Sequence, residues 1–114
     1  MGKGTHLTTY ELMAMLAILR LGKEAYGVPI CREIEAHSGR EVAVSGIYAA
    51  LERLEQRGLI TAELGEASPQ RGGRAKTYFR VSAQGLRELQ AAKQAFSSLW
   101  DGLPAMSDIS GRTT

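Results

Sequence analysis

The feature that most constrains this chain is a change in the spacing of its apolar residues at Gly58. Before Gly58, the pattern of apolar residues is that of helices. After it, residues 59–64 and 76–81 alternate between apolar and polar side chains, which predicts two short strands joined by a loop. A chain of 114 residues with 44% apolar content is one ordinary domain. We therefore expect helices followed by a hairpin within a single domain.

Two helices are predicted ahead of residue 40. Thr8 and Glu11 form a capping box that opens a helix running to about Leu21. Apolar residues cover nearly its whole circumference, so we expect burial on all sides, in part by a second subunit. The second helix begins near Gly27, with Pro29 in its first turn, and ends at residues 38–39.

A third helix is predicted over residues 45–57, with Ser45 as N-cap and Gly58 as the left-handed residue after its last turn. The apolar residues at 47, 51 and 54 share its inner face. Its outward face is polar but not strongly charged, and consists of Tyr48, Ala49, Glu52, Arg53 and Gln56.

A basic run without any acidic residue, 68–82, spans part of the loop between the two strands and the second strand itself. It contains Arg71, Arg74 and Lys76 around the pair Gly72-Gly73, whereas the formal net charge of the whole chain is only +2. Any anion-binding character must therefore be local. The glycines would let the tip approach a phosphate backbone, and the cations would neutralise phosphates with release of counterions. The alternative is a solubilising hairpin without a ligand.

Ser82 is predicted to cap a last helix that runs to about Trp100. Three- and four-residue spacing gives this helix an apolar seam, interrupted by one lysine. The seam consists of Leu86, Leu89, Lys93, Phe96, Trp100 and Leu103.

The order helix, helix, helix, strand, basic loop, strand, helix is that of a winged helix-turn-helix. The predicted fold class is mainly α (α+β), with a two-stranded wing and a C-terminal dimerisation helix. We expect a DNA-binding domain at residues 5–82, a dimerisation helix at 83–103 and a disordered tail at 104–114.

Three segments of the chain, YGVPICREIE, VSGIYAALERLEQRGLI and RGGRAKTYFRVSAQGLREL, resemble the PadR family of bacterial transcriptional regulators in order and spacing. The resemblance covers about residues 7–100. It implies a dimeric winged-helix repressor of the short form, whose single C-terminal helix crosses to the partner subunit. The chain departs from the family pattern at Glu52, where relatives often carry a basic residue, and at Gly46, where proline is common.

The residues expected to contact double-stranded DNA come from the third helix and the wing. The helix would meet phosphates and base edges, and the wing would position the protein on the phosphate backbone. For the side chains at 48 and 53, the alternatives are a packing aromatic and a solvated cation. The predicted DNA-binding set is Ser45, Tyr48, Ala49, Glu52, Arg53, Arg71, Arg74 and Lys76.

Trp100 has two possible roles, as an anchor of the dimer or as one wall of a site for a planar hydrophobic effector between subunits. Methionines of the first helix could line the same space, since methionine adapts to varied ligand shapes. The residues predicted for this dimer or ligand interface are Met13, Met15, Leu16, Leu89, Phe96, Trp100 and Leu103.

Enzymatic function is not indicated. The two histidines are isolated, the single cysteine, Cys31, lies on the inner stripe of the second helix, and no catalytic motif is present, so we expect no catalytic residues, metal or cofactor. The longest apolar stretch, residues 12–19, is far shorter than a membrane span, and the start lacks the pattern of a signal peptide. These features predict a cytoplasmic protein without a membrane partner.

The sequence therefore predicts a homodimeric winged-helix repressor that binds an inverted-repeat operator and is released by a small hydrophobic ligand. The first alternative is a winged-helix module that binds another protein through its wing and third helix. The second is a ligand-binding dimer whose DNA-binding function has decayed.

Overall fold

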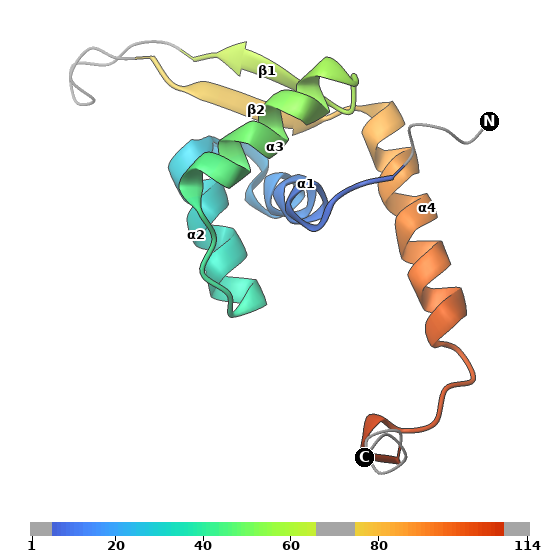
Figure 1. The fold of residues 1–114 in the computed structure, drawn as a ribbon. Helices are drawn as coiled ribbons and strands as arrows, with labels where there is room; N and C mark the ends of the chain where they lie inside the picture. Colours follow the sequence, from blue (N-terminus) through green and yellow to red (C-terminus); the bar gives the residue numbers. More distant parts are fainter. Residues whose placement is uncertain (1–5, 66–74, 109–114) are drawn as a thin grey trace.

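The computed structural model describes residues 6–65 and 75–108, and Figure 1 shows the arrangement of its elements. The predicted order of elements is confirmed. The chain forms α1 (Thr9–Leu21), a 3-10 turn η1 (Gly22–Glu24), α2 (Gly27–Ser38), α3 (Val44–Gln56), β1 (Ile60–Leu64), β2 (Thr77–Val81) and α4 (Ala83–Trp100). This is a winged helix-turn-helix, mostly helical with a two-stranded antiparallel sheet.

Helix α1 lies at the centre of the core. It contacts α2, α3, β2 and the beginning of α4. Met15 is completely buried in this core, together with Ile47 and Leu54 from the inner face of α3. The expectation that α1 is buried on all sides holds except for one strip, where Leu16 and Leu19 remain about half exposed in the single chain.

Local capping interactions fix most helix ends as predicted. The Thr8 hydroxyl accepts a hydrogen bond from the Glu11 amide (3.1 Å), and the Glu11 carboxylate accepts one from the Thr8 amide (2.9 Å), which completes the capping box. Ser82 accepts a bond from the Gly85 amide at 3.0 Å and caps α4. Gly58 has a φ of 75°, the left-handed conformation expected after α3.

The predicted N-cap of α3 is wrong. The helix begins at Val44 after Ala43, which has no side-chain cap, so Ser45 lies inside the first turn. Contacts with α1 explain the earlier start. The Ala43 amide donates to the Tyr10 hydroxyl (3.3 Å), and the Tyr10 ring packs where a Cβ on Gly46 would lie. These contacts set where the chain enters α3, which a serine side chain would otherwise decide.

The wing sheet is joined closely to the core. In its antiparallel register Ala62 lies opposite Phe79, whose ring is buried. The start of α4 packs closely on the chain at Leu59, just before β1. A Cβ on Gly85 would collide with the Leu59 carbonyl oxygen, so glycine permits this close approach. The Ser82 hydroxyl also donates to the Gly58 carbonyl at 2.7 Å. Arg71 and Arg74, predicted at the tip of the wing, lie outside the described residues.

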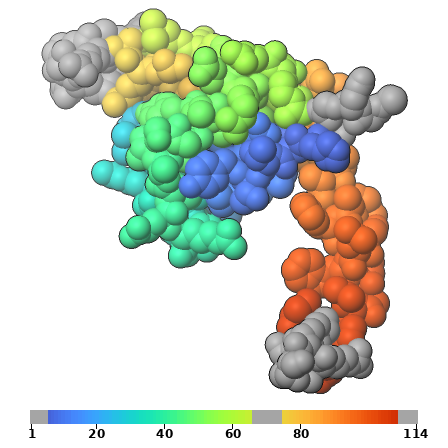
Figure 2. Space-filling model, in the orientation of Figure 1, coloured from blue at the N-terminus to red at the C-terminus, as the bar shows by residue number. Residues whose placement is uncertain are grey.

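Only the first turns of α4 pack against the domain. Leu89 is buried, but the helix then leads away from the other elements, and Figure 2 shows its C-terminal half standing clear of them. Of the predicted tail, the structure describes residues 104–108, and 106–108 form one helical turn. The exposed large apolar residues on and after α4 are Leu86, Phe96, Leu99, Trp100, Leu103 and Met106.

Candidate nucleic-acid interface

Helix α3 presents one exposed stripe, held outward by the burial of its opposite face. Its buried residues are 47, 50, 51 and 54, so the positions three and four residues apart on the other side face solvent. All five α3 residues of the predicted DNA-binding set are exposed: Ser45, Tyr48, Ala49, Glu52 and Arg53. The stripe can present hydroxyl, methyl, carboxylate and guanidinium groups to base edges and phosphates.

Tyr48 packs against α2 and is also partly exposed, so its predicted contact with DNA stays a prediction. Its side chain is 46% exposed, yet its hydroxyl occupies the space that a Cβ on Gly27 would need. The tyrosine therefore packs over the first residue of α2 while keeping part of its ring on the surface. Because Gly27 permits this close approach, the starts of α2 and α3 are held together in the helix-turn-helix pair.

Lys76 packs on Tyr26 at the base of the wing. Its ammonium group lies 4.4 Å from the centre of the Tyr26 ring, a cation–π contact. Tyr26 in turn meets Tyr78 edge to face, with ring centres 5.3 Å apart. The Phe79 amide donates to the Ala25 carbonyl (2.8 Å), which ties β2 to the segment ahead of α2. The predicted wing cation thus lies beside the start of α2.

Tyr26 was not predicted as part of this interface. The sequence signal was weak, because an aromatic residue directly before Gly27 is equally consistent with ordinary packing. Its contact with Lys76 spans fifty positions of the chain and depends on the pairing of β2 with the segment before α2.

Arg53 is joined to a buried carboxylate. Its Nε lies 2.7 Å from Oε2 of Glu11, and Arg57 Nη1 lies 3.5 Å from Oε1. Burial alone would raise the pKa of Glu11, but the hydrogen bonds from Arg53 and the Thr8 amide, with the charges of both arginines, lower it below its ordinary value. Glu11 was predicted only as a capping residue, and its pairing with α3 was missed.

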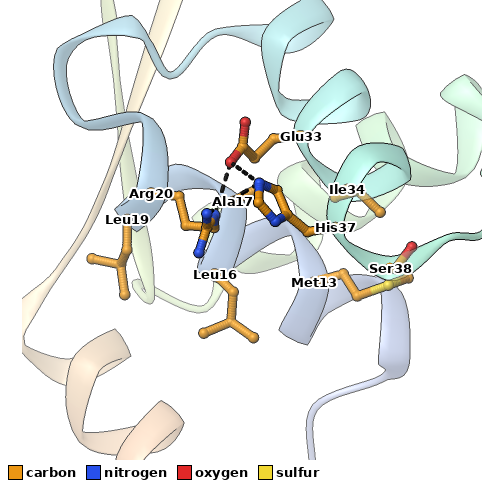
Figure 3. A pocket seen from close by; sticks show the side chains of 9 residues that line it. All are labelled: Met13, Leu16, Ala17, Leu19, Arg20, Glu33, Ile34, His37 and Ser38. Atoms are coloured by element: carbon orange, nitrogen blue, oxygen red, sulfur yellow. Dashed lines mark hydrogen bonds and ion pairs between the residues drawn. The ribbon is translucent and has the colours of Figure 1, made fainter.

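A separate apolar groove of about 460 Å³ lies between α1 and α2 (Figure 3). Met13 and Leu16 line it, as does Leu19. One edge is polar, where Glu33 accepts from Arg20 Nε at 2.8 Å and lies 3.0 Å from His37. The groove is therefore lined by Met13 and Leu16, two of the three first-helix residues predicted for the ligand interface.

The remaining residues of that interface are not brought to the groove within one chain. Met15 was wrongly assigned to the interface, because it is completely buried in the core. Leu89 is also buried against the core. Phe96, Trp100 and Leu103 are exposed on and just after the projecting half of α4 (Figure 1).

No group of three or more histidine, cysteine, aspartate or glutamate side chains that could hold a metal ion occurs in residues 6–65 and 75–108. The pKa of Cys31 is raised by burial and by the nearby charge of Glu35, so its thiol is a poor nucleophile. Within the same ranges, no helix has the length and apolar content needed to cross a membrane.

The sequence model of the transcriptional regulator PadR-like family matches residues 15–91, more than half of the chain. The chain belongs to this family. As a PadR-like regulator it is a DNA-binding transcription factor, in a family of regulators and not of enzymes. No curated protein matches the sequence.

Solved structures of transcriptional regulators share the fold of this chain. A PadR family transcriptional regulator from Eggerthella lenta is 28% identical, with a TM-score of 0.64 over 79% of this chain and 76% of the other. A PadR family regulator from Clostridium difficile R20291 is 21% identical, with a TM-score of 0.67 over 81% and 91% of the two chains. A transcriptional regulator from Clostridium thermocellum, 16% identical, has a TM-score of 0.67 over 92% and 89%.

Proposed function

We propose that this PadR-like protein is a homodimeric repressor that binds an inverted-repeat operator. Helix α3 enters the major groove with the side chains of its exposed stripe, and the wing holds the flanking phosphates through Lys76, Arg71 and Arg74. Two recognition helices related by a two-fold axis would meet half-sites about 34 Å apart. Repression is supported by the resemblance of the three sequence segments to PadR repressors.

The observation that carries the dimer is the exposed apolar surface of α4. Phe96 is 57% exposed, Leu99 74% and Trp100 64%. A run of large apolar side chains on one projecting helix is typical of a surface that pairs with another protein. We propose residues 83–103 as the dimerisation helix and residues 5–82 as the DNA-binding domain, acting on chromosomal DNA in the cytoplasm.

We also propose that a planar hydrophobic effector binds between the subunits. The groove beside Met13 and Leu16 would form one wall, and Phe96 and Trp100 of the partner subunit would form the other. An effector in this space would favour one separation of the two wings over another, and so change operator affinity. We expect a planar dye to quench the emission of Trp100 in the wild-type protein. The substitution Met13→Glu should abolish this quenching. Equal quenching in that variant would place the dye elsewhere.

Operator binding is tested by fluorescence polarisation with a duplex selected from a random library and with a scrambled duplex, over a series of salt concentrations. If each subunit neutralises about four phosphates, the logarithm of affinity falls with the logarithm of salt at a slope of about −7. Tight, selective, salt-dependent binding is expected. Weak and equal binding to both duplexes, with a flat salt dependence, would instead favour a protein-interaction module.

A further inference from the structure

The feature that the proposed function leaves unused is the buried carboxylate of Glu11. It is 2% exposed, and no other charged residue is buried in the described ranges of the chain. Both of its oxygens are engaged. Oε1 accepts from the Thr8 amide and faces Arg57, and Oε2 holds Arg53. One carboxylate at the start of α1 therefore binds two arginines that follow each other by four residues at the end of α3.

This contact controls how Arg53 is presented. Its side chain is 46% exposed, on the same stripe as Ser45 and Ala49, yet Nε is bonded to Glu11 at 2.7 Å. A guanidinium group is planar, so a bond at Nε restricts the plane in which its terminal nitrogens lie. Arg53 is thus a cation held in one orientation on the proposed DNA-binding face.

The paired charge of Glu11 stabilises the folded chain, because its bonds lower the pKa of the carboxyl group, but folding does not require a charge at this position. Burying a carboxylate is unfavourable, and replacing a buried ion pair by apolar residues often leaves a protein equally stable. The Thr8 hydroxyl already caps α1 by accepting from the backbone. A negative charge at this position has a further effect, because it offsets the attraction of Arg53 and Arg57 for any nearby phosphate.

We propose that Glu11 is a positioning residue that determines DNA specificity. It orients Arg53 for the operator, and its charge limits the attraction of Arg53 and Arg57 for phosphates of unrelated sequence. This inference rests on the proposed operator binding. Specific binding then gains from an arginine that is already oriented, while binding to arbitrary DNA is weakened by the carboxylate beneath it.

The experiment compares wild type with Glu11→Gln in the same polarisation assay. Glutamine keeps the size of the side chain and an oxygen for the Thr8 amide, but removes the charge. We expect affinity for the scrambled duplex to rise, the ratio of operator to scrambled affinity to fall about tenfold, and the salt slope to steepen by about one for each subunit. Arg53→Lys, which keeps the charge but has no Nε, should lower the ratio without steepening the slope.

Asp108→Asn is the matched control, because it removes one negative charge from an exposed position in the helical turn 106–108, outside both the proposed DNA-binding domain and the proposed dimerisation helix. It should leave both ratio and slope unchanged. If wild type prefers the operator and folded Glu11→Gln has the wild-type ratio and slope, Glu11 only joins α1 to α3 and the inference is wrong. If wild type shows no preference, the proposed operator binding fails, and the role of Glu11 falls with it.

Discussion

Replacing Trp100 by alanine tests whether the projecting half of α4 is the dimer interface. A large aromatic side chain buries about 150–250 Å², so the 64% exposure of Trp100 leaves about 100–160 Å² available to a partner subunit. At about 25 cal/mol per Å², covering this area contributes about 2.5–4 kcal/mol for each ring. A symmetric dimer holds two such rings, which gives about 5–8 kcal/mol as an upper limit.

Part of each ring stays in contact with water in most interfaces, and alanine keeps its Cβ. We therefore expect Trp100→Ala to weaken the dimer by about half of the upper limit, ~2.5–4 kcal/mol. That corresponds to a rise in the dimer dissociation constant of about 50- to 1000-fold. Because Trp100 is exposed in the single chain, the fold of each protomer should be unaffected.

Sedimentation equilibrium over a range of protein concentrations measures the dissociation constant, and circular dichroism checks the fold. Leu64→Ala is the matched control, since Leu64 is 71% exposed but lies on β1, away from α4. The control should dimerise like wild type. A folded Trp100→Ala protein with a dissociation constant within about threefold of wild type would refute the reasoning.

Three further predictions address the wing, the core and the buried carboxylate. Arg71→Ala and Arg74→Ala should each weaken binding to all duplexes alike in polarisation titrations, and each should make the salt slope about one unit shallower per site. A selective loss of affinity at one base pair would contradict a role in positioning the wing on the phosphate backbone of the DNA. Gly85→Ala should lower the free energy of unfolding by about 1–3 kcal/mol in urea titrations, because the Cβ of the alanine would collide with the Leu59 carbonyl oxygen. An unchanged free energy of unfolding would show that α4 can shift to make room for the Cβ. Because folding lowers the pKa of Glu11, its ionised form stabilises the protein above the ordinary glutamate pKa, and this contribution is lost as the pH falls through the folded pKa. The stability gap between wild type and Glu11→Gln should therefore shrink from pH 7 to pH 3, and a constant gap would assign it to packing.

The sequence predicted those parts of the fold that depend on neighbouring residues. The bonds of the Thr8 capping box and the Ser82 cap each join residues three positions apart, so short motifs were enough to find them. The alternation of residues 76–81 likewise indicated a strand, and the observed β2 is one residue shorter. The resemblance to PadR proteins, based on three such segments, led to the family that the chain belongs to.

The candidate site depended more on contacts across the chain. Glu11 and Arg53 are 42 positions apart, and nothing in the spacing of either residue indicates that they meet. The Tyr10–Ala43 contact, at the observed start of α3, joins residues 33 positions apart and is equally invisible to the spacing of the sequence. Periodicity also could not separate Met15 from Leu16, because a helix with apolar residues all round does not show which side the core will cover.

The sequence by itself thus determined the helices, the caps at Thr8 and Ser82, the hairpin and the family, since hydrogen bonds within a turn and the periods of helix and strand are local properties of the chain. The tertiary structure alone decided which charge is buried, which tyrosine contacts Lys76 and which side of α4 does not pack on the rest of the described chain. These depend on how whole elements pack, and packing brings together residues whose separation along the chain carries no periodic signal.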